Sequence, residues 1–289
     1  MTIHRSILLK LIYNDKSQEI DSNLSDSQVG ARKGKNIRNH IWVLNSITND
    51  VLRNKKREPI DIQILDYQQC FDSLWLSECL NDMFRAGFDC DKLPLLEELN
   101  KKANIKVKTP VGISEEGEIK NVVMQGDVFG PLFCSVTVDT IGKECLEEKK
   151  YLYMYKNKVP VPPLSIIDDL ICVSTYGSQT AKLNGFINVK TDCKKLQFGS
   201  DKCKKMHIGI KQEEYKCADL HVNGWEVKPV EEINTGKEVL VDKFMGEVKI
   251  EEVKEEKYLG DLLTDDGQFV KNIKHRKNKG IGIVRKLSI

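Results

Sequence analysis

The amino-acid sequence predicts a mixed α/β (α+β) fold, in which helices alternate along the chain with the strands of an antiparallel sheet. Residues 36–53 carry apolar side chains at helical spacing, and residues 60–65 alternate between apolar and polar side chains as a strand does. Residues 164–174 form two short apolar runs on either side of Asp168 and Asp169, which predicts a hairpin. With 289 residues the chain can bury a sizeable core.

The other elements follow from the same patterns and from the turn residues between them. Gly87 ends one expected helix, and Glu116-Gly117 forms the expected turn of a hairpin. Helices are expected over 73–86, 131–145 and 180–196, a hairpin over 107–119, strands over 206–210 and 257–263, and β-hairpin material or a surface insertion over 212–256.

Composition excludes several classes of protein. No segment approaches the roughly 18 apolar residues of a membrane span, so no membrane partner is expected. Residues 1–10 carry an apolar patch without a small-residue cleavage site, which argues against a signal peptide. The nine cysteines form no CxxC pair, and their odd number argues against a disulfide framework. We therefore expect an intracellular protein, in the cytoplasm or nucleus, that is not secreted.

The charge is unevenly distributed although its net value is only +2. Residues 30–57 contain eight Lys and Arg side chains and one acid, Asp50, and residues 271–289 contain seven basic side chains and no acid. Basic segments of this kind suit a polyanion such as a nucleic acid. Charge alone, however, favours the simpler interpretation that these segments are solvated helix faces.

The Asp168-Asp169 pair interrupts an apolar run in the segment PLSIIDDLICV. Burying an unpaired carboxylate is costly, so such a pair needs a turn, a partner or a cation. A tight hairpin with the aspartates at its tip meets this need. Taken by itself, an Asp-Asp pair favours an ordinary exposed hairpin turn over a functional site.

Asp66 ends the alternating strand of residues 60–65 and precedes an expected helix. Beside the hairpin carboxylates it could hold divalent cations, because Mg²⁺ prefers carboxylates, water and phosphates. Two such ions support in-line phosphoryl transfer. Taken alone, an aspartate in this place is more typical of a helix N-cap than of a metal ligand.

Six segments in a fixed order resemble the reverse transcriptases of non-LTR (LINE-type) retrotransposons, such as those of the jockey-like group. They are SDSQVGARKGKNIRNH in the fingers, LDYQQCFDSLW as motif A, VMQGDVFGPLFCSV as motif B, SIIDDLICVS as motif C, LQFGSDKCKKMHIG as motif D and EKYLGDLLTDDG as motif E. The resemblance covers about residues 25–267.

The resemblance implies a right-hand polymerase with an antiparallel palm sheet, fingers and a truncated thumb. Its fingers would comprise residues 1–62 and 90–122, its palm 63–89 and 123–262, and the start of the thumb 263–289. The implied reaction is RNA-directed DNA synthesis: dNTPs are added to the 3′ end of a DNA primer on an RNA template, with two Mg²⁺ ions for which Mn²⁺ can substitute.

The resemblance also implies a role for each matched residue. Asp66 and Asp168 would bind the metal ions, with Asp169 supporting the site and the backbone carbonyl of Tyr67 completing one coordination shell. Lys202 would donate a proton to pyrophosphate, and Phe71 would be the steric gate beneath the sugar. The implied nucleotide or template contacts are Gln125, Gly126, Arg32, Lys35 and Arg38, and the implied primer grip is Tyr258, Leu259 and Gly260.

Simpler interpretations remain open for several of these residues. Phe71 could be a core residue, and Lys202 stands in a lysine-rich run that could be a solvated face. Two positions depart from the family pattern, since Ile167 replaces a small residue before the aspartates and Gly130 replaces the serine before Pro131. The chain resembles a fragment or a truncated element copy, so a catalytically dead, nucleic-acid-binding remnant is the alternative. A two-metal nuclease would use similar carboxylates but would not need Phe71 or the Gln-Gly turn.

Overall fold

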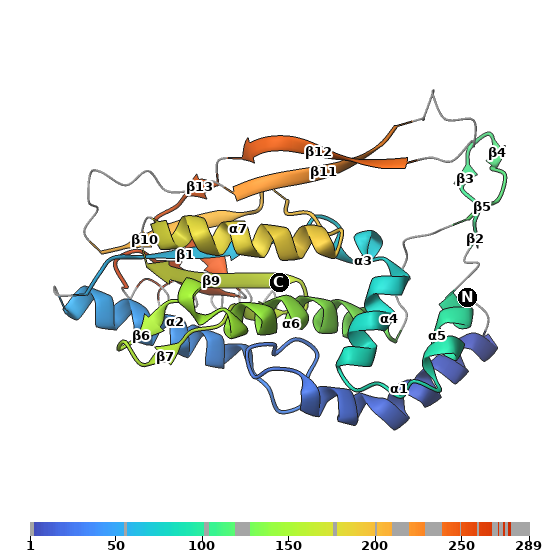
Figure 1. The fold of residues 1–289 in the computed structure, drawn as a ribbon, viewed down its shortest axis with the longest axis horizontal. Coiled ribbons are helices and arrows are strands. Elements are labelled where there is room, and N and C mark those ends of the chain that lie inside the picture. Colours follow the sequence, from blue (N-terminus) through green and yellow to red (C-terminus); the bar gives the residue numbers. More distant parts are fainter. Residues whose placement is uncertain are drawn as a thin grey trace, which may run out of the picture.

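A computed structural model shows a mixed α/β fold built around one sheet with helices on both of its faces (Figure 1). The residues that it describes are 3–54, 57–100, 104–118, 128–175, 178–199, 201–209, 220–228, 239–248, 250–258, 260–267, 271, 274, 277 and 278.

The central sheet has five strands in the order β13-β10-β1-β9-β8. Strand β1 (Ile60–Leu65) lies in the middle and pairs antiparallel with both β9 (Asp169–Thr175) and β10 (Lys204–Ile208). Strand β8 (Leu164–Ile166) pairs antiparallel with β9, and β13 (Glu251–Glu252) pairs parallel with β10. The expected antiparallel sheet with interleaved helices is therefore confirmed.

Alternation along the strands divides the core into two clusters, one on each face of the sheet. Leu65, Leu170 and Cys172 belong to the cluster that includes residues of helices α6 (Gly130–Glu147) and α7 (Ser178–Cys193). Ile62, Ile171 and their neighbours on the other face belong to the cluster that includes the apolar side of α2 (Ile37–Arg53). Both faces of the sheet are thus covered, and α7 runs along the strands in Figure 1.

The ends of these helices follow from local chemistry. The side chain of Asn36 caps α2 by accepting the backbone N–H of Arg38 at 2.9 Å. Pro131 stands in the first turn of α6, where its missing N–H costs no intrahelical bond.

Four shorter or peripheral helices complete this part of the chain: α1 (Ile3–Asn23), α3 (Cys70–Ser73), α4 (Leu76–Arg85) and α5 (Leu93–Asn100). The sequence did not predict α1 or α5. The single helix expected over 73–86 is also wrong, because Leu74 and Trp75 are extended and separate α3 from α4.

The remaining strands form small hairpins. The turn expected at Glu116-Gly117 is wrong: β3 (Lys108–Thr109) pairs with β4 (Gly112–Ile113), so the turn lies at Pro110-Val111, where proline favours it. Outside that turn, β2 (Asn104–Ile105) pairs with β5 (Gly117–Glu118). Strand β6 (Met154–Tyr155), after a short 3-10 turn (Lys149–Tyr151), pairs with β7 (Val159–Pro160).

Two further hairpins lie in the last third of the chain. The expected hairpin material within 212–256 is confirmed as β11 (Leu220–Lys228) paired with β12 (Val239–Val248), which lies over α7 in Figure 1. The single strand expected over 257–263 is instead a hairpin of β14 (Glu255–Tyr258) and β15 (Asp261–Thr264). The division into fingers, palm and thumb stays a prediction.

Among the helices in the described part of the chain, none is both long enough and apolar enough to cross a membrane.

Candidate active site

Asp66 lies where β1 ends, between the ends of β9 and β10. Its backbone carbonyl accepts the N–H of Gly199 at 2.9 Å, so the loop before β10 holds this end of the strand. Ile62 and Ile64 face the α2 side of the sheet. Alternation puts Asp66 on the same side. The prediction that Asp66 ends a strand is confirmed.

Asp168 and Asp169 lie at the tip of the β8–β9 hairpin, as expected. Ile166 pairs with Asp169, which leaves Ile167 and Asp168 as the two residues of the turn. Leu65 pairs with Leu170, so the register continued by one residue brings Asp66 opposite Asp169. The fold therefore gathers all three aspartates at one end of the sheet.

Lys202 is the basic side chain of this group. It lies in the turn between α7 and β10, and its Nζ is 3.2 Å from Oδ1 of Asp66. The side chain is 66% exposed, so the ammonium reaches the carboxylates from the solvent side. Asp66 raises the pKa of Lys202 by hydrogen bonding and by its charge.

The carboxylates are held close enough to disturb one another. Burial, followed by the charges of Asp168 and Asp66, raises the pKa of Asp169 to about 6. Burial also raises the pKa of Asp168, and Asp66 adds to this, while Lys202 acts in the opposite direction. Three aspartates facing one lysine leave the group with excess negative charge.

This donor set fits divalent cations, because carboxylate oxygens are the ligands that Mg²⁺ and Mn²⁺ accept. Within the described ranges, three ligand atoms lie within 4.8 Å of one another only at Asp89, Cys90 and Asp91, a mostly exposed group. The three site aspartates are therefore more widely spaced.

The β14–β15 hairpin brings a tyrosine to the same place. Tyr258 is 3% exposed and packs in the core cluster on the α2 face. Burial raises the pKa of its phenol, and the charge of Asp169 adds to this, so the hydroxyl lies near the carboxylates. The hydroxyl has no hydrogen-bond partner among the described residues. Gly260 is exposed in the turn at a φ of 90°, and Leu259 lies outside the described residues.

Tyr67 and Phe71 lie on the segment that follows Asp66. The Tyr67 ring is buried and stacks on Phe198 with 4.6 Å between ring centroids. On either side of Tyr67, the Asp66 carbonyl accepts the N–H of Gly199 and the Gln68 N–H donates to the carbonyl of Gln197. Coordination of a metal ion by the Tyr67 carbonyl stays a prediction. Phe71 is partly buried in α3 and packs against the core cluster on the α6 face. Its role as a steric gate stays a prediction.

The basic residues predicted to contact a triphosphate or template have different surroundings. The Arg32 guanidinium is nearly buried and bonds to the Asp21 carboxylate and to the backbone carbonyl of Gln28, so it joins its loop to α1. Lys35 pairs with Asp26 near the surface, and Arg38 is exposed on α2. Their contact with nucleotide or template stays a prediction. Gln125 and Gly126 lie outside the described residues.

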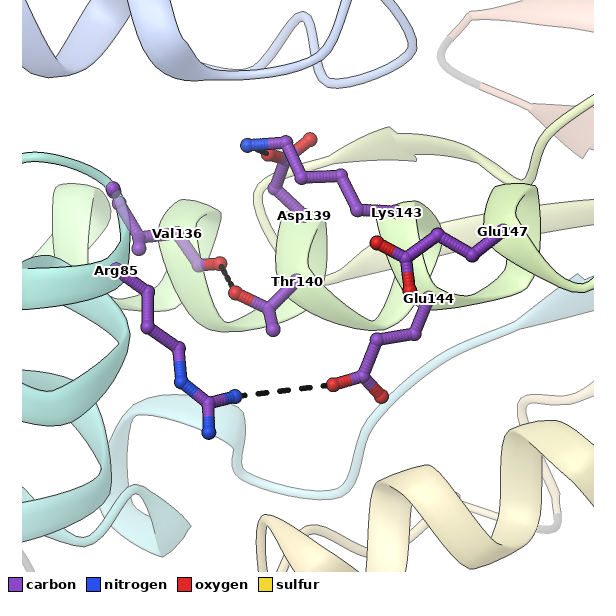
Figure 2. Close-up of a pocket in the computed structure, with 8 residues that line it drawn as sticks. Arg85, Val136, Asp139, Thr140, Lys143, Glu144 and Glu147 are labelled. Carbon is purple, nitrogen blue, oxygen red and sulfur yellow. Dashed lines mark hydrogen bonds and ion pairs between the residues drawn. The ribbon is translucent and has the colours of Figure 1, made fainter.

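A pocket of about 290 Å³ lies away from these residues, between α4 and α6. Figure 2 shows Arg85 facing Glu144 across it, with Asp139 and Lys143 nearby. The charged groups there pair with each other: Arg85 with Glu144 at 4.0 Å, and Lys143 with Asp139 at 3.0 Å. It contains none of the aspartates that the sequence singled out.

Gln28 and Gly30 belong to the segment SDSQVGARKGKNIRNH that resembles the family's fingers, and the resemblance implied no role for either of them. In the structure Gln28 is fully buried and bonds to the turn that carries Asp168. A glutamine between Ser27 and Val29 gives only a weak signal, because glutamine is normally exposed.

Comparison with known proteins adds independent findings. The family model described as "Reverse transcriptase (RNA-dependent DNA polymerase)" matches residues 5–261. Apo telomerase from Candida tropicalis aligns with a TM-score of 0.51 at 12% sequence identity, over 73% of this chain and 38% of that chain. Telomerase from the same organism with a fragment of telomeric RNA aligns at 0.49 and 15% identity, over 74% of this chain and 34% of that chain. No curated protein sequence matches the chain. At 12% identity, the likeness to the apo telomerase is one of fold.

Proposed function

Because the chain belongs to the reverse transcriptase (RNA-dependent DNA polymerase) family, we propose that it adds dNTPs to the 3′ end of a DNA primer on an RNA template. The observation that carries the proposal is the convergence of Asp66, Asp168 and Asp169 at one end of the sheet, with Lys202 3.2 Å from Asp66. In this reaction the primer 3′-hydroxyl attacks the α-phosphorus, and the bond to pyrophosphate breaks.

Each residue of the group has a task in this proposal. Asp66 and Asp168 would hold two Mg²⁺ ions, or Mn²⁺ in their place, with Asp169 supporting them. When bound, the ions would activate the hydroxyl and neutralise charge on the leaving oxygen. Lys202 would provide a proton to pyrophosphate, and its position against Asp66 keeps the ammonium at the edge of the site.

The surrounding elements are consistent with a primer and an incoming nucleotide. Tyr258 and Gly260 stand on a hairpin beside Asp169, where a primer end would lie. Phe71 follows Asp66 closely in the chain, as expected for a residue beneath the sugar. The match of motifs to non-LTR retrotransposons of the jockey-like group makes such an element the proposed origin, and the proposed location is inside the cell, where nine cysteines would stay reduced.

The test is primer extension on an RNA template by the purified 289-residue chain. Extension should require Mg²⁺ or Mn²⁺, and Asp66→Ala or Asp168→Ala should abolish it, because each removes a carboxylate that binds the ions. Asp91→Ala, at an exposed aspartate in the connection between α4 and α5, is the control and should retain activity.

Three outcomes would contradict the proposal. Extension at the native rate in either site variant would remove the metal assignment. Absence of extension by the native chain, with binding to primer-template retained, would favour the nucleic-acid-binding remnant. Cleavage of the nucleic acid without extension would favour a two-metal nuclease.

A further inference from the structure

The turn that carries Asp168 has an unusual backbone. Ile167 has a φ of 57°, which a β-branched residue rarely adopts, because its side chain then crowds the backbone. Asp168 has no positive φ, so the turn has the φ pattern of type II′, in which glycine normally occupies the first central position. Something outside the turn must hold Ile167 in this conformation.

The side chain of Gln28 makes the contacts that could do so. Its Oε1 accepts the N–H of Ile167 at 3.0 Å, and its Nε2 donates to the carbonyl of Ile167 at 3.3 Å. Both backbone groups of the strained residue are thus bound by one amide. The same Oε1 accepts the N–H of Gly30 at 2.9 Å, and Nε2 lies 3.4 Å from the carbonyl oxygen of Ser135 on α6.

Gly30 packs directly against the same peptide. A methyl group at this position would lie 2.3 Å from the backbone nitrogen of Ile167 and 2.6 Å from its Cγ1. Glycine is needed here for the close approach, since its φ is not positive. Ile167 is therefore bound by the side chain of Gln28 and packed against by Gly30.

The segment does not need the glutamine side chain to join the sheet. Val29 donates its N–H to the carbonyl of Ser165 at 3.0 Å, and Ser165 donates to the carbonyl of Ser27 at 2.8 Å. These backbone bonds already attach residues 27–29 to the edge of β8. The main partners of the buried Gln28 amide are therefore the two backbone groups of Ile167 in the turn.

We propose that Gln28 is a positioning residue, which holds the Ile167 peptide so that the adjacent Asp168 carboxylate points toward Asp66. This inference rests on the proposed polymerase function. Gln28 would act through Ile167, because its side-chain amide is buried and bonds to both backbone groups of that residue. The bond from Gln28 to the Ser135 carbonyl would also connect the turn to α6, so the position of Asp168 would depend on that helix as well.

Gln28→Met is the first variant, because methionine fills a similar volume without an amide. We expect kcat for primer extension to fall about 10- to 100-fold, with the KM for dNTP little changed. Binding of Mn²⁺ to the chain without nucleic acid, measured by electron paramagnetic resonance, should weaken over the same range. Gln63→Met is the matched control: Gln63 is also fully buried, on β1, has no hydrogen-bond partner among the described residues and faces away from the carboxylates.

Ile167→Gly separates positioning from general stability. Glycine adopts a positive φ without help, so the loss caused by Gln28→Met should be smaller in the Ile167→Gly background than in the native one. An equal loss in both backgrounds would overturn the proposal, and so would native kcat and Mn²⁺ binding in Gln28→Met.

Gly30→Ala is the second variant and covers the case in which Gln28→Met does not fold. It pushes on the same peptide and should give the same fall in kcat and in Mn²⁺ binding. Its control is Gly185→Ala on α7, where a methyl group meets no atom of the described residues within 4 Å. Native kcat in a folded Gly30→Ala chain would contradict the proposal. If the native chain itself extends no primer, the polymerase function fails, and Mn²⁺ binding alone then decides the positioning role.

Discussion

Replacing Asp169 by asparagine should make the chain more stable at neutral pH in the absence of metal ions. The pKa of this carboxyl is raised from 3.8 to about 6, first by burial and then by Asp168 and Asp66. The difference corresponds to about 3 kcal/mol of unfavourable free energy for the ionised side chain, at about 1.36 kcal/mol per pH unit. Because the side chain is only partly buried, solvent screening reduces the expected gain to about 1–2 kcal/mol.

The pH dependence follows from the direction of this change. In the folded chain the Asp169 carboxyl keeps its proton up to about pH 6, whereas in the unfolded chain it loses this proton near pH 3.8. Between these values the folded chain binds more protons, so the free energy of unfolding falls as pH rises. The advantage of Asp169→Asn should therefore be largest at pH 7 and vanish below about pH 4, where both states are protonated.

The assay is urea denaturation followed by circular dichroism at pH 7 and pH 4, with a chelator present. Asp91→Asn is the control at an exposed aspartate and should change stability by less than about 0.5 kcal/mol at either pH. Added Mg²⁺ should reduce the difference in free energy of unfolding between Asp169→Asn and the native chain at pH 7, because cations stabilise the native site. A variant no more stable than the native chain at pH 7, or equally stabilised at pH 4, would refute the reasoning.

Three further predictions concern other side chains. Tyr258→Phe removes a buried hydroxyl without a described partner, so stability should stay unchanged or rise by about 1 kcal/mol, and a clear loss in thermal denaturation would argue otherwise. Lys194→Met leaves the buried Asp82 carboxylate without its ammonium partner, so the free energy of unfolding in urea should fall by about 3–5 kcal/mol. Adding Asp82→Leu should restore most of this loss, and losses that simply add in the double variant would contradict the prediction. Phe71→Ala should raise the incorporation of ribonucleotides relative to deoxyribonucleotides, because a smaller side chain leaves room for a 2′-hydroxyl, and an unchanged ratio would assign Phe71 to the core.

The sequence by itself determined the central sheet and the places of its aspartates. Alternation over 60–65 predicted β1, and two apolar runs around Asp168 predicted the β8–β9 hairpin, because both patterns depend only on neighbouring residues and on which face they bury. It also determined the order of motifs, from which the family resemblance follows. Helix boundaries were less certain, as the break at Leu74 shows, because the apolar spacing continues across it.

Only the tertiary structure decided how distant segments meet. The pairing of β1 with β9 brings Asp66 beside Asp169, whose pKa is raised by burial first and then by the charges of Asp168 and Asp66, and no local pattern encodes these contacts. The same holds for Arg32, whose guanidinium bonds within its own loop and to α1, and for Gln28, whose amide binds a residue 139 positions away. Burial and partners of polar side chains depend on packing between elements, so the sequence indicates which residues can do chemistry and the fold determines which of them do it together.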